Sequence, residues 1–252
     1  MKNKKNLSDV GILGYGEVGK AMAKFYKNPK IKDLGRDDGL KGVEILNVCI
    51  PWSDNFVETA IKEIKNIKPK LTIIHSTVAP ETTKKIISKL PKSLQMVVHS
   101  PVRGVHPHLY EGIKTFVKFV GAEDKKSGEL AKKHLENLGI KTELAHPAKT
   151  SELAKLFCTT YYGLCVAWHG EMERICKKEG VNFRQAVSRY SITYNDGYSK
   201  LGMKNVIRPV LYEPNGKIGG HCVISNTEIF KKYYKSEAFD LILKYKPKKI
   251  GK

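Results

Sequence analysis

Short apolar runs alternate with amphipathic stretches through the first half of the chain. Val10 to Leu13 is an apolar run, a glycine-rich turn follows it, and a helical pattern then continues to Tyr26. This alternation is typical of buried strands that are separated by helices. The further strands that the pattern predicts cover residues 43–50, 71–74, 95–98, 115–120 and 141–144. The further helices that it predicts cover residues 55–67, 81–90 and 125–138.

The pattern changes after Pro147. Residues 150–178 read as one long helix, because apolar side chains recur at three- and four-residue steps and form a stripe wide enough for burial on more than one side. Gly180 is placed to end this helix. The remainder, residues 182–252, is predicted to be rich in helix and to contain a loop over residues 209–225.

The turn after the first apolar run contains Gly14, Gly16 and Gly19. At this spacing the first glycine permits a tight turn, the second lets the backbone approach a pyrophosphate, and the third lets the helix pack closely on the strand. The phosphates then lie at the helix N-terminus, where free N–H groups favour anions. The strand–turn–helix context therefore indicates a domain that binds NAD. The fingerprint residues expected at the cofactor are Gly14, Tyr15, Gly16, Glu17, Val18 and Gly19.

Together these patterns predict an α/β chain of two parts. Residues 1–145 are expected to form a Rossmann domain with a doubly wound parallel sheet, because strands and helices alternate there. Residues 146–252 are expected to form the long central helix and a small helical region.

Within the Rossmann part, an acidic residue about 20 positions after the fingerprint should hold the adenosine ribose. Asp33 lies at that distance, and Asp37 and Asp38 are alternatives because the second strand is short and difficult to place. Lys32 and Arg36 lie nearby and leave binding of the 2′-phosphate of NADP as an alternative, although NAD is favoured over NADP. Three further cofactor-binding residues are expected where predicted strands end: Pro51, Ser76 and Thr77.

The charge balance favours anionic ligands. The 252 residues include 45 Lys and Arg against 25 Asp and Glu, a formal net charge of +20, which attracts phosphates. The lysines are dispersed and do not alternate with stacking aromatic residues, so nucleic acid is not expected as a partner. No apolar run reaches the ~20 residues that a membrane span needs. The N-terminus also lacks the apolar region of a signal peptide, and a cytoplasmic location is expected.

The segment of residues 215–222 contains the most distinctive candidate chemistry. Cys222 follows the paired glycines Gly219 and Gly220 and the histidine His221. Glycines let a chain pass close to a ligand, and an adjacent histidine favours the nucleophilic thiolate. The five cysteines are odd in number and share no CxxC spacing, which argues against disulfides and a structural zinc site.

Histidines gather at predicted strand ends and in the segment of residues 99–108. Five histidines are candidate bases, because they lie at or near strand ends or loops, where active sites of such sheets collect: His75, His99, His106, His108 and His221. Arg103 is a candidate clamp for a phosphate or carboxylate. A metal on His106 and His108 is an alternative, but no Cys/His quartet accompanies them and no metal is expected.

Four motifs follow one another along the chain: the glycine fingerprint, Ser76-Thr77-Val78, a helical Glu152-Leu-Ala-Lys155 segment and Gly219-Gly220-His221-Cys222. With them the chain resembles the UDP-glucose/GDP-mannose dehydrogenase family over most of its length. The resemblance implies that a sugar-nucleotide primary alcohol is oxidised with NAD through a thiohemiacetal on Cys222.

The resemblance also implies roles for further residues. Lys155 stabilises the oxyanion, Thr77 lies in the loop that closes over the cofactor, and the helix of residues 150–178 forms a homodimer interface. Glu152 is either a catalytic residue or an ordinary acid of the first helical turn. The residues expected at the substrate are Lys155, Arg103, Gly219, Gly220 and His221.

Three positions depart from the family pattern. Thr159 replaces an asparagine, Asn226 replaces an aspartate, and Val102 replaces a glutamate. Two candidate bases for hydrolysis of an acyl intermediate are thereby lost, which leaves open whether the oxidation transfers two or four electrons. The family's C-terminal nucleotide-sugar-binding domain is also expected to be missing. Two alternatives follow: a two-electron dehydrogenase of a smaller phosphorylated or carboxylated substrate, or a catalytically degenerate NAD-binding protein.

Overall fold

The computed structural model describes residues 9–220 and 222–247. The chain divides into two compact units, Met1–Lys155 and Leu156–Lys252, and the division falls inside one long helix. Each unit is described below by itself. The domain boundary was expected near residue 145, before that helix begins. The compact units instead divide at Lys155, inside the helix, and the expected boundary stays a prediction.

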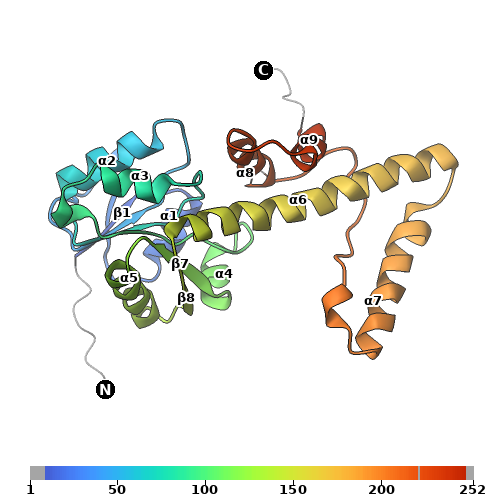
Figure 1. The fold of residues 1–252 in the computed structure, drawn as a ribbon, viewed down its shortest axis with the longest axis horizontal. Coiled ribbons are helices and arrows are strands. Elements are labelled where there is room, and N and C mark those ends of the chain that lie inside the picture. Colours follow the sequence, from blue (N-terminus) through green and yellow to red (C-terminus); the bar gives the residue numbers. More distant parts are fainter. Residues whose placement is uncertain (1–8, 221, 248–252) are drawn as a thin grey trace. The chain divides into compact units, whose positions relative to one another are not determined.

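The first unit contains an eight-stranded sheet in the order β3-β2-β1-β4-β5-β6-β7-β8 (Figure 1). Neighbouring strands are parallel except in the pairs β2–β3 and β6–β7. The strand order reverses its direction at β1, which pairs with both β2 and β4, and the predicted doubly wound α/β class is thus confirmed. The strands are β1 (Val10–Leu13), β2 (Lys30–Asp33), β3 (Arg36–Asp37), β4 (Ile45–Val48), β5 (Leu71–Ile74), β6 (Val97–His99), β7 (Lys118–Ala122) and β8 (Thr142–Ala145).

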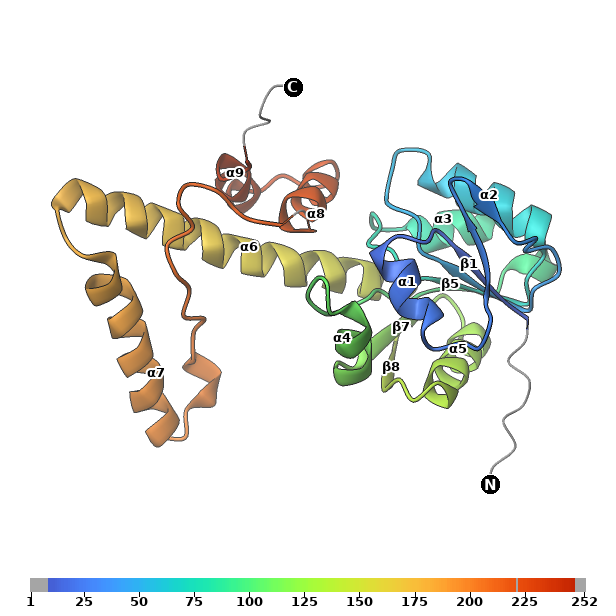
Figure 2. The same cartoon turned by 180° about the vertical axis from the view of Figure 1, so that it is seen from behind.

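Helices cover both faces of the sheet, as Figures 1 and 2 show from opposite sides. One apolar core contains residues of α1, α4 and α5, and the other contains residues of α2 and α3. Adjacent residues of one strand serve the two cores, since Ile73 of β5 belongs to the first and Ile74 to the second. The helices are α1 (Glu17–Ala23), α2 (Phe56–Ile67), α3 (Thr82–Ser88), α4 (Leu109–Thr115) and α5 (Lys125–Asn137), with a 3-10 turn at Lys92–Leu94.

Most of the predicted elements are found, and the differences have local causes. β1 and β5 have the predicted bounds. The helix α4 was not predicted, because seven residues are too few to show a helical period, and the strand expected at 115–120 begins only at Lys118.

The second unit is helical. Its first helix is the continuation of α6 (Ala148–Glu179), which contains the predicted central helix. The loop predicted to reach residue 225 is shorter, because α8 begins at Cys222. None of the helices in the described ranges combines the length and apolar character that a membrane crossing requires. The other elements are a π-helical turn (Arg184–Arg189), α7 (Tyr190–Lys200), a 3-10 turn (Lys204–Val206), α8 (Cys222–Lys231) and α9 (Glu237–Lys244).

Two glycines of α6 let α8 and α9 pack against it. A Cβ at Gly163 would lie 2.4 Å from Cγ1 of Val223, and a Cβ at Gly170 would lie 2.3 Å from the ring of Tyr245. Glu171 strengthens the contact, because its carboxylate accepts hydrogen bonds from Lys244 and from the Tyr245 hydroxyl. The small core of this unit therefore depends on residues of α6 that have no side chain to obstruct it.

Candidate functional site

The glycine turn between β1 and α1 has the geometry that its spacing predicts. Gly14 has φ +92°, and a Cβ there would lie 2.8 Å from the backbone carbon of Cys49. A Cβ at Gly19 would lie 2.0 Å from the Gly14 carbonyl oxygen, so only glycine lets α1 approach the turn. Gly16 is the N-cap of α1, and a Cβ there would meet nothing within 4 Å. Two of the glycines are thus required by the fold, whereas Gly16 faces open space.

The other fingerprint residues connect the turn to its surroundings. The Tyr15 backbone N–H donates to the Asp33 carboxylate at 3.0 Å, and the Tyr15 ring lies under the Arg36 guanidinium at 5.6 Å. The Glu17 carboxylate contacts the His106 ring, and Val18 packs against the apolar core of the first unit. The turn is therefore held to the end of β2 and to the segment that follows β6.

Among the three candidate acids, Asp33 is the one that ends β2 next to the fingerprint. Asp38 is occupied elsewhere: it accepts from Arg36 at 2.7 Å and from the Ile31 backbone N–H at 3.0 Å. The Arg36 guanidinium lowers the pKa of the Asp38 carboxyl group. Lys32 donates to Glu63 at 2.8 Å. The two basic side chains that were alternatives for binding a 2′-phosphate are thus both paired with carboxylates.

The loops after β4 and β5 are joined by a hydrogen bond. The Ser76 hydroxyl donates to the Ile50 carbonyl at 2.6 Å, directly before the exposed Pro51. Thr77 is half-buried at the same edge of the sheet. This edge is where ligands of doubly wound sheets bind, and the sequence places all three expected residues there.

His75 and His99 are core residues instead of accessible bases. Their exposed fractions are 1% and 0%. Burial lowers the pKa of His75, and it lowers the pKa of His99 to about 3. The His99 ring contacts the Ser151 hydroxyl at 2.7 Å and the Ser76 carbonyl at 3.1 Å. Their interpretation as candidate bases is therefore wrong, because it considered their place along the strands and not their burial.

The segment after β6 contains one apolar and one cationic side chain. Val102 is 6% exposed and belongs to the core that contains Leu109 and Ile113. Arg103 is half-buried, and its guanidinium lies 5.2 Å from the centre of the Phe116 ring. Within the described ranges, no three His, Cys, Asp or Glu side chains come together to hold a metal ion.

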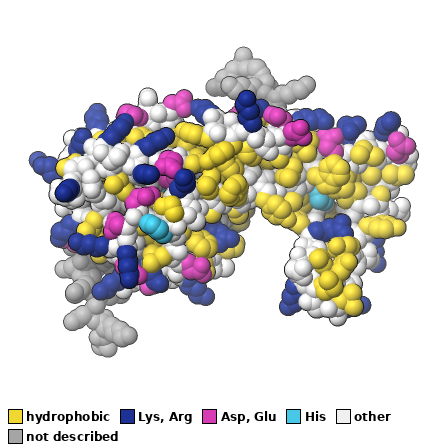
Figure 3. Space-filling model, viewed as in Figure 1, with side chains coloured by type: hydrophobic (Ala, Val, Ile, Leu, Met, Phe, Trp, Pro, Cys, Tyr) yellow, Lys and Arg dark blue, Asp and Glu magenta, His cyan; other side chains and the backbone are white. Residues whose placement is uncertain are grey.

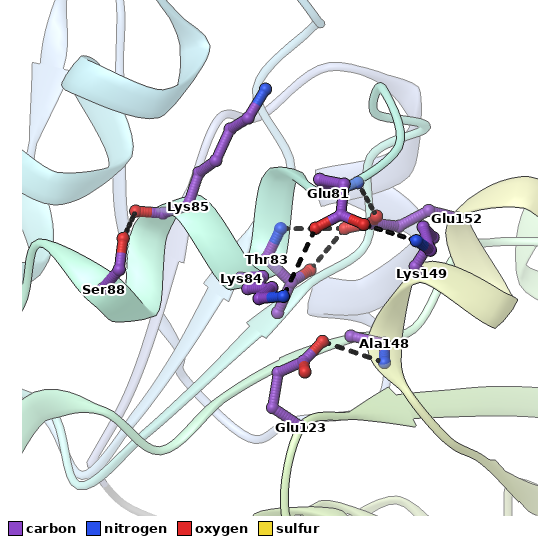
Figure 4. A network of polar contacts seen from close by, with 9 residues as sticks. All are labelled: Glu81, Thr83, Lys84, Lys85, Ser88, Glu123, Ala148, Lys149 and Glu152. Atoms are coloured by element: carbon purple, nitrogen blue, oxygen red, sulfur yellow. Dashed lines mark hydrogen bonds and ion pairs between the residues drawn. The ribbon is translucent and has the colours of Figure 1, made fainter.

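Glu152 caps another helix. It is fully buried, and its carboxylate accepts from the backbone N–H groups of Glu81 (2.6 Å) and Thr83 (2.8 Å) and from the Thr83 hydroxyl (2.7 Å), as Figure 4 shows. Burial raises the pKa of this carboxyl group. Lys149 reinforces the contact by pairing with the Glu81 carboxylate. These bonds satisfy free N–H groups at the start of α3, so the geometry favours a structural role for Glu152 over a catalytic one.

Lys118 is a buried cation that the sequence reading overlooked. It lies on β7, is 2% exposed, and donates to the carbonyls of Ser100 at 2.5 Å and Pro101 at 3.1 Å. Burial lowers the pKa of this lysine to about 7. The positive charge of Lys155 on α6 also lowers it. The sequence feature that could have revealed Lys118 is a lysine among otherwise apolar strand residues.

The predicted nucleophile lies in the second unit, whereas Lys155 ends the first. Cys222 is the first residue of α8 and is half-buried. Gly219 is exposed, and Gly220 has φ +75°, a conformation that favours glycine. The remaining residue of this motif, His221, lies outside the described residues.

Two of the three unusual positions contact each other in the second unit. The Asn226 side-chain amide on α8 donates to the Thr159 hydroxyl on α6 at 3.2 Å. Asn226 is 6% exposed, and Thr159 also donates to the Leu156 carbonyl. The two replacements therefore form one neutral hydrogen-bonded pair.

Comparisons with known proteins find similarity to UDP-N-acetyl-D-mannosamine dehydrogenases. The UDP-N-acetyl-D-mannosamine dehydrogenase of Methanococcus maripaludis is 28% identical over 190 residues, which are 75% of this chain and 40% of that protein. The chain thus spans about two fifths of the length of this curated relative. No protein-family model matches the chain.

Solved structures share the fold. The UDP-D-ManNAc dehydrogenase of Pyrococcus horikoshii has a TM-score of 0.73 at 18% identity, over 94% of this chain and 68% of that one. A 3-hydroxyisobutyrate dehydrogenase of Mycobacterium tuberculosis, determined with L-serine, has a TM-score of 0.66 at 13% identity. That match covers 92% of this chain and 90% of the other.

Proposed function

We propose that the chain belongs to the nucleotide-sugar dehydrogenase family and is an NAD-dependent oxidoreductase of a sugar-nucleotide primary alcohol. The observation that carries the proposal is the turn of Gly14, Gly16 and Gly19 beside Asp33, at the point where the strand order reverses. No side chain of the turn obstructs the open face of Gly16, which fits a pyrophosphate.

The residues of the turn would hold the cofactor by its phosphates and by one ribose. Backbone N–H groups at the start of α1 would receive the pyrophosphate, and the Asp33 carboxylate would bind the adenosine ribose hydroxyls. NAD is favoured over NADP, because Asp33 repels a 2′-phosphate while Lys32 and Arg36 are paired with carboxylates. Bound NAD supplies the hydride acceptor.

The covalent step is assigned to Cys222. After the alcohol carbon loses a hydride and its hydroxyl a proton, the Cys222 thiolate adds to the aldehyde carbon, and a C–S bond forms as the C=O π bond becomes an alkoxide. The ammonium of Lys155 stabilises that negative charge. Asn226 and Thr159 form a neutral pair and Val102 lies in an apolar core, so these positions supply no carboxylate to activate water for hydrolysis of an acyl intermediate.

A homodimer is part of the same proposal. Large apolar side chains gather on the surface of the second unit, in the view of Figure 3. On α6 alone Phe157, Tyr161 and Trp168 are each more than half exposed. Exposed apolar patches of this kind mark interfaces. A cytoplasmic location stays a prediction from the sequence.

The deciding experiment measures NADH formation, with purified protein, NAD and a panel of UDP- and GDP-sugars. We expect turnover in the wild type and a loss of at least about a thousandfold in Cys222→Ala, since the variant lacks the nucleophile. Cys158→Ala, which removes an exposed thiol of α6, is the matched control and should keep wild-type turnover. Full turnover in Cys222→Ala would refute the covalent mechanism.

A second candidate function is a two-electron dehydrogenase of a small carboxylated substrate. The fold match to 3-hydroxyisobutyrate dehydrogenase favours it, because that match covers 90% of a protein of similar extent. Reduction of NAD with short hydroxy acids, equal in Cys222→Ala and wild type, would support this candidate. Tight NAD binding without turnover on either panel would instead indicate a catalytically degenerate protein.

A further inference from the structure

Lys118 is a buried lysine that the proposed mechanism does not use. Both of its hydrogen bonds end on backbone carbonyls, those of Ser100 and Pro101, and it makes no ion pair among the described residues. Burying an ammonium without a carboxylate is costly. A protein that keeps such a group in its sheet gains something from it that an apolar side chain would not supply.

The Ser100 carbonyl is the centre of a small polar cluster. His75 contacts the same oxygen through Nδ1 at 3.1 Å, and its Nε2 contacts the Asn47 side chain at 2.8 Å. The Ser100 hydroxyl is buried and has no hydrogen-bond partner within the described part of the chain. The titratable groups that interact electrostatically with Lys118 are Cys49, His75, His99 and Lys155. The backbone of the loop after β6 is thus held from the sheet side by hydrogen bonds to Lys118 and His75.

A second contact, from the residue that caps the C-terminus of α4, supports the next residues of the loop. The Phe116 ring, two positions before Lys118, lies 5.2 Å below the Arg103 guanidinium. Phe116 has the extended backbone dihedrals φ −84° and ψ 145°, and β7 begins two residues later at Lys118. Residues 116 and 118 therefore hold the loop at two points: its backbone through Lys118 and its cationic side chain through Phe116.

We propose that Lys118 is a positioning residue for Arg103, which binds an anionic group of the substrate, a phosphate or a carboxylate. The buried ammonium fixes the two carbonyls that precede Val102, and the Phe116 ring restrains the guanidinium at the other end. A guanidinium held in this way can present two donors to one oxyanion with little loss of side-chain entropy. The inference rests on the proposed function for its substrate and on the loop geometry for its mechanism.

The test is a double-mutant cycle with Arg103→Met and Lys118→Met. We expect each single variant to raise the KM for the anionic substrate by about tenfold or more, with kcat changed by less than about threefold. The double variant should be no worse than Arg103→Met, because Lys118 acts through Arg103. Lys133→Met, which removes an exposed lysine of α5, is the control and should leave KM unchanged. Additive effects, or a wild-type KM in Lys118→Met, would overturn the proposal.

A second measurement needs no turnover. Amide hydrogen exchange of residues 102–105 should be at least about tenfold faster in Lys118→Met than in wild type and Lys133→Met, while NAD affinity stays unchanged. Unchanged exchange overturns the positioning role even if no substrate is found, so this result and a failure of the proposed function are distinguishable. If Lys118→Met does not fold, Phe116→Leu replaces it and should raise KM by a smaller factor.

Comparing KM values for sugar nucleotides and for short hydroxy acids shows which anionic group Arg103 binds. A KM increase for sugar nucleotides in Arg103→Met assigns a phosphate or sugar substituent, and an increase for short hydroxy acids assigns a carboxylate. An Arg103→Met variant with wild-type KM for every substrate that turns over would overturn the assignment of Arg103 as the anion-binding group.

Discussion

Burial decides what the polar residues of the first unit can do. His75, His99 and Glu152 have the side chains of general bases, yet all three are nearly or fully inaccessible and their ring nitrogens or carboxylate oxygens are hydrogen-bonded within the unit. Lys118 shows the converse, since a residue type that is normally exposed lies inside the sheet. At this scale the sequence identifies chemical types, and the environment assigns their roles.

Glu152 offers a test that separates structure from catalysis. Glu152→Ala should lower the free energy of unfolding by about 2–4 kcal/mol, because the N–H groups of Glu81 and Thr83 lose their buried acceptor. Denaturant unfolding measures the change. The exposed Glu129→Ala on α5 is the control, expected within about 0.5 kcal/mol of wild type. A catalytic role would instead appear as lost turnover in Glu152→Ala with unchanged stability.

The helix α6 shows how one element serves different neighbours along its length. Its first turns cap α3 through Glu152 and pair with Glu81 through Lys149. Within the second unit, its glycines admit Val223 of α8 and Tyr245 after α9. Its exposed apolar residues then leave one surface for another partner. The width of the apolar stripe was readable from the sequence, but the partner of each position was not.

Two glycine-to-alanine substitutions should change the stability of the protein in opposite directions. Gly170→Ala should destabilise the second unit by about 1–3 kcal/mol, because the added Cβ would lie 2.3 Å from the Tyr245 ring. Gly197→Ala, in α7, meets nothing within 4 Å and should stabilise by about 0.5–1 kcal/mol through helix propensity. Thermal unfolding of both variants measures the difference. Equal effects in the two variants would show that α9 does not pack on α6 at Gly170.

At the scale of the whole molecule, the α6 surface predicts self-association. Sedimentation of the wild type should show a dimer, and Trp168→Asp should weaken it by at least about tenfold, because a charge would replace a large apolar side chain that is 52% exposed in one chain. Leu130→Asp, on α5 and 40% exposed, is the control and should leave the dimer intact. A wild-type chain that sediments as a monomer would contradict the homodimer.

The sequence by itself determined the glycine turn and most of the element order of the first unit, although α4 was not predicted. The bounds of β1, β5 and α5 were predicted nearly to the residue. The tight turn at Gly14 and the close packing at Gly19 followed from the glycine spacing. These features are local: hydrophobic period and glycine sterics act between residues that are close along the chain. The start of α8 at Cys222 was missed because its apolar face becomes visible only against α6.

Only the tertiary structure decided which distant residues meet. It brought Asn226 to Thr159, Glu152 to the start of α3, and Lys118 to the carbonyls before Val102. These pairings depend on how helices and strands pack, and packing is set by shape and burial over the whole unit instead of by neighbours along the chain. Burial then changed the chemistry, since an exposed lysine or histidine titrates near its ordinary pKa and a buried one does not.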